Sequence, residues 1–283
     1  MGRDTLIKIR EQEMLVIASQ NSQRLVSRTV GTGNDLVLLH GWGMNSGAFS
    51  SFIPFLSSHF RVTTIDLPGF GENATVLPAR YDLASLTAMI AAHLPAHAII
   101  AGWSLGGLVA QSLALEETEL RGVVTLASSP KFVAGPGWPG IDPALLDEFK
   151  SQLKDDYQKT IDRFLAIQAM GSDSARHDIK RIRQQITDYP APAEAALHGG
   201  LGILGDADMR ERIGRIQRPS LRIYGRRDTL VPSSGIDRIC ELHPQSDTVV
   251  LPHASHAPFM SHPQQTANII LNFAASLDQK TLA

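Results

Sequence analysis

The sequence predicts an α/β protein whose mostly parallel sheet lies between helices, and three observations support this. Short apolar, β-branched runs bounded by Gly, Pro or Asp recur along the 283 residues, as strands do. Most of these runs are continuously apolar rather than alternating, which is typical of strands covered on both faces. Helical patterns separate the runs, as a doubly wound fold requires. With 43% hydrophobic residues, the chain can bury one substantial core.

The expected elements alternate along the chain. The strands are RLVSRTVG from residue 24, DLVLLHG from 35, RVTTIDLPG from 61, AHAIIAGW from 96, LRGVVTLASS from 120, PSLRIYG from 219 and DTVVLP from 247. The helices between and after them are ASLTAMIAAHL from 84, LGGLVAQSLALEE from 105 and SHPQQTANIILNFAASL from 261. In the last of these, Pro263 suits the first turn of a helix.

The alternation breaks once, between ASSP at 127 and PSLRIYG at 219. This stretch of roughly 90 residues opens on the Gly- and Pro-rich AGPGWPGIDP and continues with helical periodicity. We therefore expect an α/β core over residues 1–130 and 215–283, with a helical lid inserted at 131–214. Such a lid would cover the carboxyl ends of the strands, where open α/β sheets bind ligands. The apolar stripe expected on its first helical segment comprises Leu146, Phe149, Leu153, Tyr157, Ile161, Phe164, Leu165 and Gln168.

Composition excludes several classes of partner. The 26 basic and 28 acidic residues nearly balance, so the molecule has no overall field suited to nucleic acid or to an anionic membrane. The longest apolar runs, such as LVLL, are far shorter than a membrane span. The single cysteine, Cys240, cannot form an internal disulfide, and the opening MGRDTLIKIREQEMLVIAS lacks the apolar stretch of a signal peptide. We expect a soluble cytoplasmic protein.

The segment Gly102-Trp103-Ser104-Leu105-Gly106 carries the clearest chemical signal. It matches G-x-S-x-G between an expected strand and an expected helix, which is the context of a nucleophile elbow. The glycines are needed because so sharp a strand-to-helix turn leaves no room for a Cβ two residues before or after the serine. A glycine-rich turn with an incidental serine is the alternative, and the strand and helix on either side favour the nucleophile.

A nucleophilic serine needs a base and a group that orients the base. In this architecture they follow in the order Ser, acid, His. Asp228 ends the strand in IYGRRDTLVP and is the candidate acid, whereas Asp66 precedes the serine and is expected to organise its own Gly-Pro turn. Among ten histidines, His256 in PHASHAPF lies in the loop between the last strand and the last helix, and His253 is its rival.

Ester hydrolysis also needs hydrogen-bond donors for the oxyanion of the tetrahedral intermediate. One is expected to be the backbone N–H of Leu105, directly after the nucleophile. The other should come from the loop LLHGWGMN, with Trp42 as the donor. The Trp42 side chain is also a candidate wall of the substrate pocket, and His40 is expected to brace this loop rather than react.

These motifs resemble the α/β-hydrolase superfamily over essentially the whole chain. The resemblance is carried by H-G-x-x at 40, D-x-P-G-x-G at 66, G-x-S-x-G-G at 102, Asp228 and His256. A closer resemblance, over roughly residues 30 to 275, is to the pimeloyl-[acyl-carrier protein] methyl ester carboxylesterases of biotin synthesis. The stretches that carry it are LVLLHGWGMN, DLPGFG, GWSLGGLVA, ASSP, WPGI, RFLAIQAMG, GGLGIL and HAPFMSHP.

This resemblance implies a serine carboxylesterase that removes the methyl group from a pimeloyl thioester held on acyl-carrier protein, releasing methanol and ending chain elongation. Ser104 would attack the ester carbonyl, His256 would take and return the proton, and Asp228 would orient the imidazole. Water would hydrolyse the acyl-enzyme, with no cofactor and no metal. The partner would be the acidic carrier protein.

The family binds its carrier through basic lid residues. Mapped by position, these are Lys159, Arg163, Arg176 and Lys180, two pairs at i, i+4 spacing. From the residues alone, a solvated face is the alternative, because residues 131–196 hold 9 Lys and Arg against 10 Asp and Glu. The resemblance also implies an apolar channel for the acyl chain lined by Phe132, Trp138, Phe164 and Met170, of which Phe164 is the strongest candidate for ligand contact.

Other functions use the same residues. A general short-acyl carboxylesterase or a carbon–carbon bond hydrolase would keep the Ser104 triad, whereas epoxide hydrolases and dehalogenases of the superfamily place Asp at the position of Ser104. A hydrolase-like ligand receptor or scaffold is a non-enzymatic alternative with an intact pocket. We expect a monomer.

Overall fold

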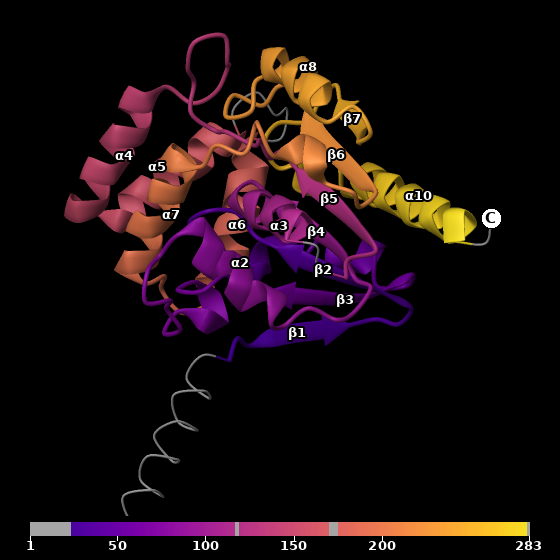
Figure 1. Cartoon of the computed structure of the whole chain (residues 1–283). Helices are drawn as coiled ribbons and strands as arrows, with labels where there is room; N and C mark the ends of the chain where they lie inside the picture. The colour runs from indigo at the N-terminus through magenta and orange to yellow at the C-terminus, as the bar shows by residue number, and fades with distance from the viewer. Residues whose placement is uncertain (1–23, 117–118, 170–174, 282–283) are drawn as a thin grey trace, which may run out of the picture.

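The fold centres on a seven-stranded sheet in the order β1-β3-β2-β4-β5-β6-β7 (Figure 1). The computed structural model describes residues 24–116, 119–169 and 175–281. All neighbouring strands are parallel except the edge pair β1–β3. The strands are β1 (Ser27–Val30), β2 (Asn34–Leu39), β3 (Phe60–Ile65), β4 (Ile99–Trp103), β5 (Gly122–Leu126), β6 (Ser220–Gly225) and β7 (Asp247–Leu251).

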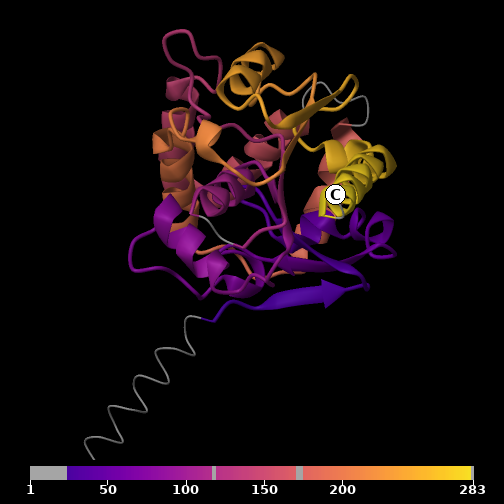
Figure 2. The ribbon, with the colours of Figure 1, turned by 45° about the vertical axis from the view of Figure 1, so that its right-hand side comes forward.

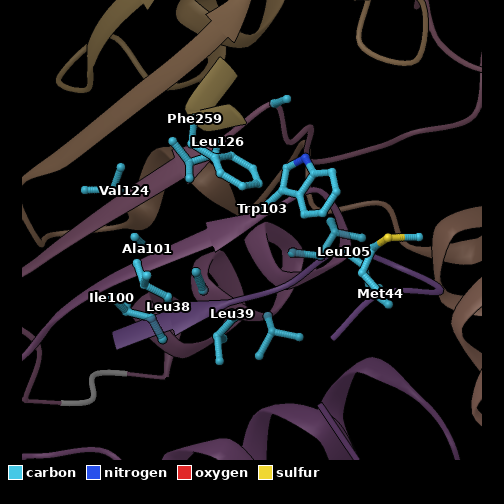
Figure 3. Close-up of a cluster of buried hydrophobic side chains, with 14 of the residues drawn as sticks. Leu38, Leu39, Met44, Ile100, Ala101, Trp103, Leu105, Val124, Leu126 and Phe259 are labelled. Carbon is cyan, nitrogen blue, oxygen red and sulfur yellow. The ribbon is translucent and has the colours of Figure 1, made fainter. Parts of the chain in front are cut away.

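Burial of the strands explains their apolar sequence. Every residue of β4, β5 and β6 is buried, whereas all four residues of the edge strand β1 are exposed. Figure 3 shows side chains of the central strands packed together, among them Leu38, Ile100 and Val124. The prediction of strands covered on both faces therefore holds for the centre of the sheet and not for its antiparallel edge.

Helices cover both faces of the sheet. Arg222 of β6 contacts Gln111 of α3 (Leu105–Leu115), and it pairs in register with Thr125 of β5. A Cβ on Gly122 of β5 would instead meet side chains of α10 (Pro263–Thr281). Since residues 122 and 125 point to opposite faces of a strand, α3 and α10 lie on opposite faces. The remaining core helices are α2 (Leu83–Ala91), α8 (Ser233–Leu242) and the short α9 (Pro258–Ser261).

Among the described residues, four α-helices lie between β5 and β6 in the chain; Figure 1 shows α4, α5 and α7 together on one side of the sheet, and Figure 2 shows the molecule turned by 45°. They are α4 (Pro143–Asp155), α5 (Tyr157–Ala169), α6 (Ala175–Thr187) and α7 (Glu194–Asp206). The sequence predicted one continuous stripe over α4 and α5, but the chain breaks between them at Asp156. Asp156 Oδ1 accepts the Lys159 N–H at 3.0 Å and so starts α5. Tyr157 consequently leaves the stripe and is 40% exposed.

Short polar helices were harder to predict. The sequence analysis assigned no helix to Ser233–Leu242, which forms α8. The predicted last helix corresponds to α10, and the short α9, which the sequence analysis did not assign, precedes it. Within the described ranges, none of the helices has the length and apolar character that a membrane span needs.

Candidate active site

Ser104 occupies the turn that joins β4 to α3. Its backbone has φ 53° and ψ −114°, a conformation that residues with side chains rarely adopt. A Cβ on Gly102 would lie 2.1 Å from the Gly106 carbonyl oxygen, and a Cβ on Gly106 would lie 2.5 Å from that of Leu39. Both glycines are therefore required by close backbone contacts, as the sequence predicted for the positions two before and two after the serine.

The main chain of Ser104 is held from β5. Its N–H donates to the Leu126 carbonyl at 3.0 Å, and its carbonyl accepts from the Ser128 hydroxyl at 2.8 Å. Ser128 lies in the ASSP segment directly after β5 and is fully buried. The sequence analysis gave Ser128 no role, because a serine that bonds to a distant backbone group carries no local signal.

Asp228 lies in the loop after β6, with its carboxylate held from two sides. Oδ1 accepts the N–H groups of Leu230 at 2.8 Å and Val231 at 3.0 Å, as an Asp at the start of a tight turn does. Oδ2 lies 2.8 Å from His256 Nδ1. The carboxylate is therefore fixed by its own loop and presents one oxygen to the imidazole.

His256 is fully buried in the loop after β7. Its N–H donates to the Gln168 carbonyl of α5 at 3.3 Å, and its carbonyl accepts from the Trp103 indole at 2.8 Å. Trp103 directly precedes Ser104, so the imidazole loop is tied to the strand that presents the serine. The second ring nitrogen, Nε2, is buried and makes no hydrogen bond with any residue that the structure describes. In unliganded enzymes a base and its nucleophile are often farther apart than a hydrogen bond.

The rival histidine lies elsewhere. His253 is exposed, and its Nδ1 lies 3.2 Å from a guanidinium nitrogen of Arg227. The Asp228 carboxylate contacts the imidazole of His256. The structure therefore brings Asp228 together with the histidine that the sequence analysis preferred.

The two backbone amides expected to bind the oxyanion are those of Leu105 and Trp42. Leu105 is the first residue of α3, so its N–H has no acceptor within the helix. Neither this amide nor that of Trp42, in the loop after β2, bonds to any of the described residues. The N-terminus of α3 adds its positive dipole end at the same place. Chemically, this arrangement can stabilise an oxyanion.

The Trp42 loop is braced by a histidine and an aspartate. His40 Nε2 accepts the Leu67 N–H at 2.9 Å, so the proton of the neutral ring is on Nδ1, which donates to the Gly41 carbonyl at 2.8 Å. Burial keeps the pKa of His40 below its usual value, against the opposing effect of Asp66. Asp66 accepts the N–H groups of Ser46 and Glu72. Both side chains thus hold loops, as the sequence predicted.

An aromatic wall stands beside this loop. The ring centroids of Trp42 and Phe164, on α5, lie 4.8 Å apart. The Trp42 indole N–H donates to the Leu197 carbonyl of α7 at 2.9 Å. Phe164 also contacts Phe149 of α4, with ring centroids 5.6 Å apart. The inserted helices therefore pack directly on Trp42, in the loop after β2. Two further residues were expected to line the acyl channel. The Trp138 indole donates to the Lys131 carbonyl, and its ring lies under the Arg210 guanidinium. Met170 lies outside the described residues.

Comparisons with known proteins fit this geometry. The α/β-hydrolase fold family matches residues 35–263. A pimeloyl-[acyl-carrier protein] methyl ester esterase of Aeromonas hydrophila is 50% identical over 244 residues, covering 86% of this chain and 96% of the relative. An esterase of the same name from Yersinia pseudotuberculosis is 43% identical over 248 residues, covering 87% and 95%. The chain belongs to this esterase family, within the α/β hydrolases.

Solved structures agree on the fold. A bromoperoxidase of Bacillus anthracis and an esterase of Exiguobacterium antarcticum each superpose with a TM-score of 0.78 at 20% identity, over 88% of this chain and 94% of theirs. These structures confirm the predicted α/β-hydrolase fold, and the esterase relatives confirm the assignment to the carboxylic ester hydrolases. Identity at this level carries no information about the substrate.

The basic residues that the esterase family suggests for carrier binding differ in their surroundings. Lys159 and Lys180 are exposed on α5 and α6. Arg163 is instead engaged within the inserted helices: both terminal nitrogens contact the Glu148 carboxylate at 2.7 and 2.9 Å, and the guanidinium lies over the Phe149 ring. Arg176 belongs to α6, but its side chain lies outside the described residues.

Proposed function

We propose that this protein hydrolyses the methyl ester of a pimeloyl group carried by acyl-carrier protein, releasing methanol. The observation that carries the proposal is the buried Asp228–His256 pair, joined through Trp103 to a strained serine turn. Relatives at 43–50% identity that bear this activity in their names support the choice of substrate. A general short-acyl esterase remains the competing function, and the experiments below separate the two.

The reaction uses the chain's own groups. Ser104 Oγ attacks the ester carbonyl while His256 Nε2 takes its proton, and Asp228 keeps the other ring nitrogen protonated and oriented. The amides of Trp42 and Leu105 bind the oxyanion. The tetrahedral intermediate expels methoxide, which receives the proton from the imidazolium and leaves as methanol. Water then attacks the acyl-enzyme with the same base, and Ser104 recovers its proton.

The inserted helices supply the substrate's surroundings. Residues 131–214 act as a lid over the carboxyl ends of the strands, and the Trp42–Phe164 contact forms an apolar wall for the acyl chain. The outer faces of α5 and α6 present Lys159 and Lys180 to the carrier. The enzyme would work in the cytoplasm as a monomer.

Methanol release tests the reaction directly. The purified protein should release methanol from the carrier-bound pimeloyl methyl ester, and Ser104→Ala should abolish the release. A fluorophosphonate probe should give one adduct, on Ser104. Absence of labelling in folded protein would favour a receptor or scaffold, and hydrolysis of small esters without hydrolysis of the carrier-bound ester would favour the general esterase.

Charge reversal tests the carrier. Arg163→Glu with Arg176→Glu should reduce turnover of the carrier-bound ester and leave p-nitrophenyl butyrate hydrolysis near normal. Because Arg163 is paired with Glu148, its reversal places like charges together and can also lower stability. Lys159→Glu with Lys180→Glu therefore serves as a second variant at exposed positions. Equal losses on both substrates in both double variants would remove the carrier from the proposal.

A further inference from the structure

The carbonyl of Ser104 and the N–H of Leu105 belong to one peptide group. Within the described residues every peptide bond is trans, and a trans peptide group is planar, so this carbonyl and this N–H point in opposite directions. Whatever fixes the direction of the Ser104 carbonyl therefore also fixes that of the Leu105 N–H, which the proposed mechanism assigns to the oxyanion. The angle that rotates this group is ψ of Ser104, which is −114°.

A side chain from the neighbouring strand holds this carbonyl. The Ser128 hydroxyl donates to it at 2.8 Å, and Ser128 is fully buried. The same carbonyl accepts the N–H groups of Gly107 at 2.9 Å and Leu108 at 3.3 Å, both of which belong to α3. Figure 3 shows Trp103 and Leu105, on either side of the serine, with Leu126 of β5 nearby. The hydroxyl therefore ties the peptide group to β5, whereas the other two donors tie it to its own helix.

The last glycine of the G-x-S-x-G-G motif at 102 makes room for this hydroxyl. A Cβ on Gly107 would lie 2.5 Å from Ser128 Oγ and 2.9 Å from the Gly102 carbonyl oxygen. Gly107 lies within α3, where glycine is less favourable than alanine. The chain thus has a helix-weakening residue at the point where the Ser128 hydroxyl needs space.

The backbone is also strained where it delivers Ser128. Ala127 has φ 45°, in the left-handed region that residues with a Cβ rarely adopt. It directly follows β5, and its N–H donates to the Ile223 carbonyl of β6 at 2.8 Å. Ser104 has φ 53° at the end of the adjacent strand β4. Because such strain persists only where the surrounding structure holds it, and clusters at functional sites, these two bends indicate one shared arrangement.

We propose that Ser128 is a positioning residue that aims the Leu105 N–H at the oxyanion by holding the Ser104 carbonyl. This inference rests on the proposed function and adds a residue to its mechanism. Without the hydroxyl, the carbonyl keeps its two donors from α3, so the helix remains formed. The strained ψ of Ser104 is then no longer held from β5, and the peptide group can rotate. The loss should therefore fall on the oxyanion contact.

An alkyl trifluoromethyl ketone isolates this contact. Ser104 Oγ adds to its carbonyl carbon, the serine proton passes to His256 Nε2, and the carbonyl oxygen becomes an oxyanion with no group leaving. In Ser128→Ala we expect the Ki of hexyl trifluoromethyl ketone to rise, and kcat on p-nitrophenyl butyrate to fall, each by about tenfold to a hundredfold. This is less than the loss caused by deleting an oxyanion donor outright. The KM should stay within about twofold, since the contact forms in the transition state.

Ser129→Ala is the matched control. Ser129 is also a buried serine whose hydroxyl donates to a main-chain carbonyl, that of Lys131 at 2.6 Å. Each variant should lower the melting temperature by about 2–4 °C, and Ser129→Ala should keep the wild-type Ki and kcat. Ser128→Cys keeps a weak donor at the same position, so its Ki should lie between those of the wild type and Ser128→Ala. It carries the comparison if Ser128→Ala does not fold.

All constants are measured well below the melting temperatures. Wild-type Ki and kcat in the folded Ser128 variants would overturn the inference and leave the proposed function standing. Equal rises in Ki and KM would also overturn it, because a generally loosened site weakens substrate and ketone alike, and so would equal effects in Ser129→Ala. If the wild type neither hydrolyses esters nor binds the ketone at Ser104, the proposed function fails and the inference fails with it.

Discussion

Asp228 Oδ2 lies 2.8 Å from His256 Nδ1, and both side chains are buried. The other carboxylate oxygen, Oδ1, accepts the N–H groups of Leu230 and Val231. The two oxygens thus have separate tasks: Oδ1 shapes the loop and Oδ2 faces the imidazole. A substitution that keeps the first contact and changes the second should separate folding from activity.

Asp228→Asn is that substitution. If the amide oxygen keeps the loop contacts, the amide nitrogen faces Nδ1 as a donor, which stabilises the wrong tautomer of His256. We expect kcat to fall by about four orders of magnitude, as for such changes in serine hydrolases. Steady-state kinetics with p-nitrophenyl butyrate measures it. The melting temperature should change little, and a variant that unfolds instead would show that the carboxylate charge is needed for the fold.

Two glycines, one in the serine turn and one in α7, should respond in opposite ways to replacement by alanine. In Gly106→Ala the new methyl group would lie 2.5 and 2.6 Å from the carbonyl oxygens of Leu39 and His40, so we expect a loss of at least about 3 kcal/mol in unfolding free energy. Gly202 lies within α7, and a Cβ there meets nothing within 4 Å. Gly202→Ala should therefore stabilise the protein by up to about 1 kcal/mol. Urea unfolding compares them, and equal effects would contradict the packing described for the turn.

The sequence predicted the strands and the turn well because their causes are local. Residues 99–103 form a continuous apolar run, and burial on both faces requires one. The glycines around Ser104 are adjacent to the serine whose turn needs them. Asp228 and His256 were found as residues at strand ends, because the carboxyl ends of parallel strands meet at one edge of the sheet. Their contact is observed, and their catalytic roles remain predictions.

The features that the sequence missed depend on distant or main-chain partners. Ser128 bonds to a carbonyl, and Gln168 holds the His256 loop through its own carbonyl, so neither side chain type predicts the contact. Helix α8 is only ten residues long and has a Gly near its start, which argues against a helix although its apolar residues are spaced as in one. The break at Asp156 is made by a side-chain cap inside an otherwise continuous helical pattern.

The bond from Trp103 to the His256 carbonyl should matter for activity. Trp103→Phe keeps an aromatic ring in contact with Phe259, 5.1 Å away (Figure 3), but removes the N–H and leaves a buried carbonyl without that donor. We expect about 1–3 kcal/mol of lost stability. We also expect a lower kcat with a nearly unchanged KM, because the imidazole loop is less well placed. Loss of stability with wild-type kcat, measured well below the melting temperature, would limit the bond to a structural role.

Stability should also depend on pH through His243, which lies at the C-terminal end of α8. Its Nδ1 is 2.9 Å from a guanidinium nitrogen of Arg222, a buried arginine that also donates to the Gln111 amide oxygen. Burial and the charge of Arg222 lower the pKa of His243 from 6.5 to about 4. A protonated imidazole here would lose its hydrogen bond and place two cations side by side.

Because the folded pKa of His243 lies below the unfolded value, the unfolded chain takes up the proton first. The contribution of neutral His243 is complete above about pH 6.5 and is lost as the pH falls toward about 4. The total loss is at most about 3.5 kcal/mol, at 1.36 kcal/mol per pKa unit. Urea unfolding across this range should show the decline, and His243→Asn, which keeps an acceptor for Arg222 without a titrating group, should remove this part of it. His59→Asn is the control at an exposed histidine. If it changes the pH dependence of the unfolding free energy as much as His243→Asn does, the Arg222 contact is not the source of that dependence.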